Sequence, residues 1–202
     1  MVWQDYRAGN YDLYAQRINS SGAAQWAANG VTVCTAALSQ STALAVTDRA
    51  GGLIAAWSDG RGGGTDIYAQ RVLASGSVAW LADGIPVITG VTNELPLALV
   101  PVDGVAGAIV AWRDDRAGNS DLYVQRVEQG SPVWADGGVA LTTYPTAQSS
   151  AVIAPDGSGG VVAAWVDARG ATAQDIYAQR VDGFGQGTKG ARNDGSVGSF
   201  CP

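Results

Sequence analysis

Hydrophobic and polar positions follow a pattern that this chain repeats four times. Each copy of the motif is an apolar run that ends in Trp-x-Asp-x-Arg, then a glycine-rich turn, then Asp-(Ile/Leu)-Tyr-(Ala/Val)-Gln-Arg-(Val/Ile). The copies occupy residues 3–18, 57–72, 112–127 and 165–181, so their tryptophans are 54, 55 and 53 residues apart. A self-similar period of this length indicates a solenoid, a propeller or another repeat array.

One copy with its flanking residues divides into four short strands. In the second copy we expect strands at 42–47, 53–59, 66–73 and 77–89, with a tight turn at 48–52. The second of these strands is apolar on both faces, as is expected where both faces of a sheet are packed. Four short antiparallel strands with regular turn signals are typical of a propeller blade.

The sequence therefore predicts an all-β fold, a β-propeller of about four blades, each a four-stranded antiparallel sheet. The units are expected at about 1–38, 39–92, 93–146 and 147–182. The first blade is expected to be incomplete at its N-terminus, because the chain opens inside a copy of the motif. Part of a larger ring, completed by a second chain or by further sequence, is the alternative to a four-bladed ring.

The glycine-rich segment 183–202 is predicted to be a C-terminal tail. Its residues 195–201 could add a strand to the incomplete first blade, as in propellers whose two chain ends share one blade. Such a strand would bring Cys201 into the region of Cys34, and a disulfide between these two cysteines is one hypothesis.

Composition narrows the classes of partner. The net charge is −6, and eight of the eleven arginines belong to the motif, so no basic patch is left to follow nucleic acid or an anionic membrane surface. The sequence contains no run of about 18 apolar residues, so we expect no membrane insertion. The chain has no histidine, which removes the commonest general base and the commonest transition-metal ligand.

The charged and aromatic residues of the motif have two interpretations. The first is structural: a polar group between packed blades is tolerated only when it is paired, so Asp59 or Asp66 should pair with an arginine such as Arg61 or Arg71. The identity of the residues in all four copies favours this interpretation. The fourth-strand tryptophans are likewise expected to pack the blade edges: Trp26, Trp80 and Trp134.

The second interpretation is a multivalent ligand site on the loops at one end of the blades. Its candidate residues are two aspartates and an arginine from each copy: Asp5, Arg7, Asp12, Asp59, Arg61, Asp66, Asp114, Arg116, Asp121, Asp167, Arg169 and Asp175. A sugar would suit them, since aromatic faces stack on pyranose rings and carboxylate–guanidinium pairs bridge hydroxyls. Calcium is the alternative ligand for Asp…Gly…Asp loops, although the spacing matches no EF-hand or nonapeptide pattern and an arginine lies inside the loop. We expect no cofactor.

The same motif carries a resemblance to a known family. The turn Asp-Gly-x-Gly-Gly, the apolar strand ending in Trp-x-Asp-x-Arg-x-Gly and the Asp-Ile-Tyr stretch resemble the blades of TolB-type propellers. The longer form, with Tyr-Ala-Gln-Arg and a later Gly-x-x-x-Trp, is similar to a group of bacterial secreted or surface repeat proteins. The resemblance covers residues 1 to about 182 and implies a propeller with protein–protein contacts.

These observations favour a non-enzymatic binding or scaffold propeller of an extracellular or cell-surface bacterial protein that recognises a protein or a glycan. The alternative is a structural building block that forms homo-oligomers by strand exchange through open blade edges. A third hypothesis is a glycoside-active enzyme with paired carboxylates. Against an enzyme, the only two glutamates, Glu94 and Glu128, lie outside the motif, and the aspartates are almost all part of it.

Overall fold

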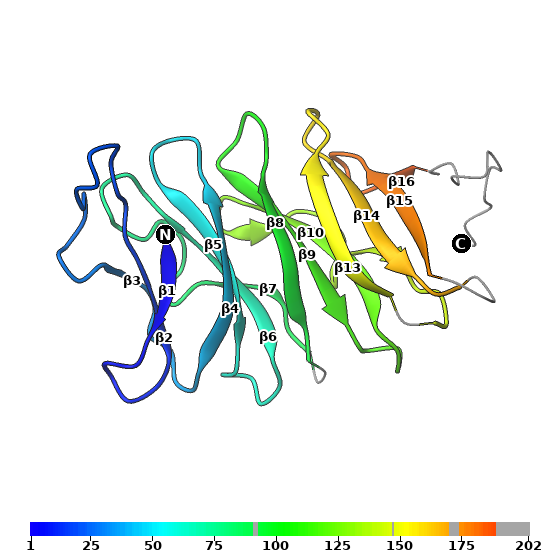
Figure 1. Ribbon diagram of the computed structural model, residues 1–202, viewed down its shortest axis with the longest axis horizontal. Helices are drawn as coiled ribbons and strands as arrows, with labels where there is room; N and C mark the ends of the chain where they lie inside the picture. Colours follow the sequence, from blue (N-terminus) through cyan, green and yellow to red (C-terminus); the bar gives the residue numbers. More distant parts are fainter. Residues whose placement is uncertain (91–92, 147, 170–173, 189–202) are drawn as a thin grey trace.

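The described part of the chain consists of β-strands, turns and loops. A computed structural model describes residues 1–90, 93–146, 148–169 and 174–188, and these residues contain no helix (Figure 1). The prediction of an all-β fold is therefore confirmed. Among the same residues, no helix is long and apolar enough to cross a membrane.

The first two sheets come from the first two copies of the motif. The first sheet has the order β1 (Val2–Asp5), β2 (Asp12–Ala15) and β3 (Val31–Cys34). The second has the order β4 (Gln40–Thr47), β5 (Leu53–Asp59), β6 (Asp66–Val72) and β7 (Ile85–Ile88). Among the residues that the structure describes, the first sheet has no counterpart of β4, which agrees with the incomplete first unit that the sequence suggested.

The third and fourth sheets follow the same plan. The third has β8 (Leu95–Pro101), β9 (Gly107–Asp114) and β10 (Asp121–Glu128), and the outer side of β10 pairs with both β11 (Ser131–Pro132) and β12 (Val139–Thr142). The fourth has β13 (Gln148–Pro155), β14 (Val161–Asp167), β15 (Asp175–Val181) and β16 (Gly187–Thr188). Strand β16 lies in the segment predicted as a tail and pairs there with β15.

The four sheets stand in an open row. The first sheet is at one end and the fourth at the other, and the inner strands β4, β8 and β13 lie in sequence along the row (Figure 1). Strand β8 contacts both β4 and β13. The described residues do not close a ring, so a propeller stays a prediction.

Each sheet packs on the next through two faces of constant composition. We call the face that carries the motif tryptophan the front face, and the opposite face the back face. At the first junction the back-face residues Leu13 and Ala15 pack against the front-face residues Ala55, Trp57 and Val72. Because each interior sheet is packed on both faces, its second strand is apolar on both faces up to the motif tryptophan, which explains the lack of alternation there.

The next two junctions repeat this packing position by position. At the second, Ile67 and Ala69 of the back face meet Trp112 of the following sheet. At the third, Leu122 and Val124 meet Trp165. The core is therefore a series of equivalent layers between neighbouring sheets and not one central cluster, as in other repeat arrays.

Backbone hydrogen bonds fix how neighbouring sheets meet. The N–H of Gln40, the first residue of β4, donates to the carbonyl of Tyr11, the residue before β2, at 2.8 Å. The equivalent bonds run from Glu94 to Thr65 at 2.8 Å and from Gln148 to Ser120 at 3.0 Å. One bond of this kind recurs at each of the three junctions.

The predicted contribution of the C-terminal segment to the first blade falls on residues 195–201, outside the described residues. Cys201 also lies outside the described residues, so the suggested disulfide with Cys34 stays a prediction. Cys34 is buried at the first junction, where its Sγ accepts a hydrogen bond from Arg61 at 3.1 Å. Burial raises the pKa of this thiol to about 12.

Candidate functional site

Four side chains of each motif copy form one compact cluster. In the second sheet, Trp57 and Tyr68 are cross-strand partners whose rings stack with centroids 6.4 Å apart. The indole Nε1 of Trp57 donates to Asp59 at 2.8 Å, and the guanidinium of Arg61 lies 4.0 Å from the centre of the Tyr68 ring. Arg61 also forms a salt bridge with Asp59 at 2.6 Å.

The same cluster occurs in all four sheets. Its tryptophan, aspartate, arginine and tyrosine are Trp3, Asp5, Arg7 and Tyr14 in the first sheet, Trp112, Asp114, Arg116 and Tyr123 in the third, and Trp165, Asp167, Arg169 and Tyr177 in the fourth. The arginine also reaches beyond the cluster. Arg61 donates to the carbonyl of Asp83, and Arg169 donates to Thr142 of the preceding sheet at 3.0 Å.

The first aspartate of the motif is fully occupied by these contacts. The Oδ1 atom of Asp59 accepts from the backbone N–H and the Nε of Arg61, while Oδ2 accepts from Trp57 and Arg61. Burial raises the pKa of Asp59, but the hydrogen bonds from Arg61 and Trp57 outweigh it, so the pKa lies below its usual value. A carboxylate held in this way is ionised and stabilises the sheet, which agrees with the structural interpretation of Asp59 and Arg61.

The second aspartate of the motif forms no salt bridge with an arginine among the described residues. This corrects the expected pairing of Asp66 with Arg61 or Arg71. Asp66 accepts from the backbone N–H of Gly90 at 3.0 Å. Arg71, the other arginine of that copy, binds Asp48 in the turn before β5, with Nε 3.0 Å from Oδ2. The turn aspartate was missed because it lies outside the motif. An aspartate at the start of a glycine-rich turn is a recognisable turn signal in the sequence. In the structure, Oδ1 of Asp48 accepts hydrogen bonds from the N–H groups of Ala50 and Gly52.

Asp12 and Asp121 are buried with little compensation. Each accepts one hydrogen bond on Oδ1, from Asn10 and Asn119 respectively, and each has a buried Oδ2 with no hydrogen-bond partner among the described residues. Burial, followed by the charge of the facing Asp114, raises the pKa of Asp121 although Asn119 lowers it. Asp175, the equivalent residue of the fourth sheet, is exposed.

The two aspartates of each copy face each other across a strand pair. Asp59 is the cross-strand partner of Asp66, and Asp114 is the partner of Asp121. Within the described residues, no group of three or more acidic, cysteine or histidine side chains is arranged to hold a metal ion.

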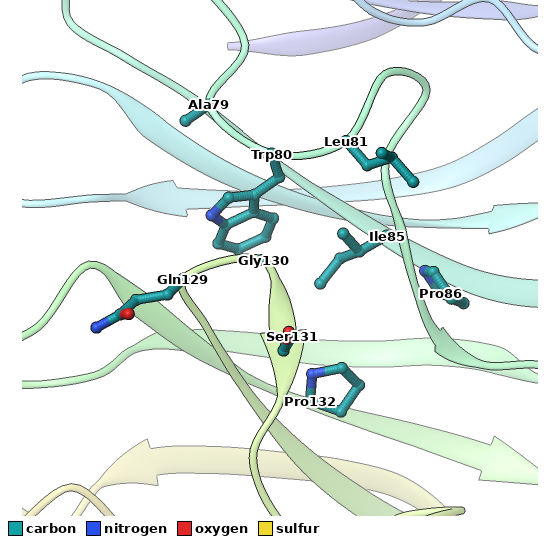
Figure 2. Close-up of a pocket in the computed structure, with 9 residues that line it drawn as sticks. All are labelled: Ala79, Trp80, Leu81, Ile85, Pro86, Gln129, Gly130, Ser131 and Pro132. Atoms are coloured by element: carbon teal, nitrogen blue, oxygen red, sulfur yellow. The ribbon is translucent and has the colours of Figure 1, made fainter.

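A groove between the second and third sheets departs from the repeat. It encloses about 650 Å³ and is lined by Trp80, Leu81, Ile85 and Pro86 on one side and by the 129–132 turn on the other. Figure 2 shows the indole of Trp80 lying over Gly130, with Gln129 to one side and Ile85, Ser131 and Pro132 around the opening. Ligand binding was predicted for the loops at the end of the strands that carries the loop between Asp59 and Asp66. The 129–132 turn lies at the opposite end of the strands.

The groove follows from a shortened turn. In the second sheet three residues, 74–76, lie between Leu73 and Ser77, which are hydrogen-bonded to each other. In the third sheet only Gln129 and Gly130 lie between the paired residues Glu128 and Ser131. Both have positive φ, at 48° and 81°, as a two-residue hairpin turn requires.

The missing residue changes the contacts of the neighbouring tryptophan. Trp26 donates its indole N–H to the carbonyl of Ala74 at 2.9 Å, and Trp134 donates to the carbonyl of Gly183 at 3.1 Å. The indole N–H of Trp80 makes no corresponding hydrogen bond within the described residues, and its side chain lines the groove. All three tryptophans pack against a junction core, as predicted, but Trp80 differs in keeping an indole donor on a groove wall.

Sequence reasoning did not separate Trp80 from the other two tryptophans. The signal was present as a one-residue difference in spacing, because the turn after the third copy reads Glu-Gln-Gly-Ser where the second reads Leu-Ala-Ser-Gly-Ser. A scan against protein-family models finds no match to this chain, and a search of curated proteins also finds none.

Proposed function

We propose that this chain is an arc of a β-propeller that works as a non-enzymatic binding module of an extracellular or cell-surface bacterial protein, and that it binds a glycan in the Trp80 groove. The observation that carries the proposal is the indole N–H of Trp80, which has no hydrogen-bond acceptor among the described residues, beside a hollow that the shortened 129–132 turn leaves open. The repeated layer packing of the sheets supports the propeller arc.

The chemistry of the groove suits a sugar ring. The indole offers an apolar face and a polar edge, which is the combination that a pyranose with C–H faces and hydroxyl groups requires. Gln129 and Ser131 add an amide and a hydroxyl, and Pro86 and Pro132 supply rigid apolar walls. A few polar groups in a mainly apolar hollow are typical of a small-ligand site.

The repeated Asp–Arg clusters have a supporting part in this proposal. Their carboxylates already accept hydrogen bonds from the tryptophan and arginine of the same sheet, so they hold the strands and leave binding to the groove. The absence of an enzymatic role is part of the proposal.

The test is a titration of the whole chain with soluble oligosaccharides of glucose, xylose, N-acetylglucosamine and galacturonate, followed by tryptophan fluorescence and calorimetry. Trp80→Ala should weaken binding at least about tenfold, equivalent to about 1.4 kcal/mol. Trp26→Ala is the matched control, because this tryptophan occupies the same place in the repeat but donates its N–H to Ala74.

A second variant tests the turn itself. One glycine inserted between Gln129 and Gly130 restores the three-residue length of the 74–76 turn and should close the hollow. Binding is then expected to disappear while the melting temperature stays near that of the parent chain. Equal binding by the parent, Trp80→Ala and the insertion variant would contradict the groove as the site.

A further inference from the structure

Apolar side chains on the back face of the fourth sheet are exposed, and no other sheet of the described residues packs on this face. Leu13, Ile67 and Leu122 occupy the same back-face position in the first three sheets, and none of them is exposed. Their counterpart Ile176 is 63% exposed. The side chain is of the same class as the other three, so the difference lies in what packs against it.

Neighbouring positions of that face show the same contrast. Ile54 and Ile109 are fully buried at the position where Val162 is 42% exposed. Val152 of β13 and Ala178 of β15 are exposed as well. We call the surface formed by Val152, Val162, Ile176 and Ala178 the fourth back face.

The front face of the first sheet is the complementary surface. Trp57, Trp112 and Trp165 are buried by the preceding sheet, whereas Trp3 is partly exposed. Beside it, Ile18 is 45% exposed at the position where Val72 is fully buried. We call the surface formed by Met1, Trp3 and Ile18 the first front face.

We propose that these two faces pack head to tail between two copies of this chain, so that the fourth back face of one copy covers the first front face of the next. The contact continues an interface that the molecule already makes three times. At each internal junction a front face with the motif tryptophan covers a back face of the same apolar composition. A second copy offers such a front face uncovered.

The intermolecular junction lacks one element of the internal ones. At each internal junction, a residue at or directly before the start of an inner strand donates a backbone hydrogen bond to the preceding sheet, as Gln40 does to Tyr11. Within the described residues, the first sheet consists of β1, β2 and β3 and has no inner strand to make this bond. The contact between copies therefore rests on apolar burial and is expected to be reversible and dependent on concentration.

A head-to-tail contact joins different surfaces, so it produces a ring if the rotation between copies closes and an open filament if it does not. Two copies would place eight sheets in sequence, and propellers of about four to eight blades are common. This proposal is independent of the glycan groove, which lies between the second and third sheets, away from both end faces.

The test measures the mass of the whole chain by light scattering and native mass spectrometry over a range of concentrations. The parent chain should form multiples of 20.6 kDa as its concentration rises. Ile176→Asp blocks the fourth back face and Ile18→Asp blocks the first front face, and each variant alone should remain a monomer. Leu38→Asp is the control, because Leu38 is an exposed apolar residue at positive φ outside both faces.

Mixing the two blocked variants gives the decisive result. Each variant keeps one intact face, so the mixture should form a one-to-one dimer and nothing larger. Unchanged melting temperatures of both variants show that they are folded, as expected for exposed positions.

Four results would overturn the proposal. The parent chain could remain a monomer at every concentration, or the mixture could fail to form the dimer. Association lost in Ile176→Asp but kept in Ile18→Asp would indicate two back faces packed together. Association kept in both variants would indicate strand exchange.

Discussion

Two aspartates of the motif that face each other across one strand pair differ in how their buried charges are compensated. Asp114 accepts hydrogen bonds from Arg116 and Trp112, whereas its cross-strand partner Asp121 accepts one from Asn119. Both carboxylates are fully buried. The comparison therefore separates the benefit of a paired buried charge from the cost of a poorly compensated one.

We predict that Asp114→Asn lowers stability and Asp121→Asn raises it at neutral pH. Burial raises the pKa of Asp114, but Arg116 and Trp112 bring it below its usual value, so its stabilisation is present above pH 3.8 and disappears as the pH falls through the lowered pKa. The loss should be about 1–2 kcal/mol, a modest value because Arg116 is partly exposed. Urea unfolding at pH 7 measures both changes.

The pH dependence supplies the control for this pair. The raised pKa of Asp121 means that its ionisation destabilises the fold as the pH rises above 3.8, so the gain from Asp121→Asn should vanish at about pH 3. Two losses of equal size at pH 7 would show instead that both carboxylates are stabilising.

At the scale of one element, the turn before β3, β7 and β12 contains a glycine where an added side chain would meet the motif tryptophan. Gly84 has φ of +90°, and a Cβ atom there would lie 2.5 Å from Cη2 of Trp57 and 2.9 Å from the carbonyl oxygen of Ala69. Gly30 and Gly138 make the same approach to Trp3 and Trp112. The repeated tryptophan therefore packs directly on a backbone turn of its own sheet.

We predict that Gly84→Ala is much more destabilising than Gly63→Ala. Gly63 has nearly the same φ, +89°, but nothing lies within 4 Å of a Cβ placed there. Gly63→Ala should cost about 1–2 kcal/mol from backbone strain alone. Gly84→Ala should cost about 1–3 kcal/mol more because Trp57 must move. Thermal unfolding of the two variants measures the difference, and equal costs would exclude the tryptophan contact as its cause.

The elements of this fold follow from the sequence to a large extent, because the motif sets strand type, strand order and packing together. The apolar run at 53–57 and the turn at 48–52 lie where the sequence placed them, and the Asp59–Arg61 pair forms as expected. The partner of Arg71 was not predictable from the motif, since Asp48 lies in a turn outside it. The Trp80 groove was missed because its cause is one residue absent from a turn, while every residue of the groove wall has an ordinary counterpart elsewhere.

At the scale of the whole molecule, each sheet touches only its neighbours, so stability is expected to vary along the row. In the described part of the chain, the second and third sheets are covered on both faces, and the fourth is covered on its front face alone. The amide groups of β15 should consequently open at a lower free energy than those of β6 and β10. If a second copy covers the fourth back face, as proposed, it should also raise the local stability of β15, so association and local stability are linked.

Hydrogen exchange measured at low and high protein concentration tests this link. At low concentration, β15 should exchange faster than β6 and β10, because its back face meets solvent. At high concentration, a second copy covering the fourth back face should slow exchange in β15 and leave β6 and β10 unchanged, since binding to the folded state stabilises what it covers. Ile176→Asp should remove the dependence on concentration. Equal protection of all four sheets at low concentration would mean that the row unfolds as one cooperative unit, so that an uncovered end face does not weaken it locally.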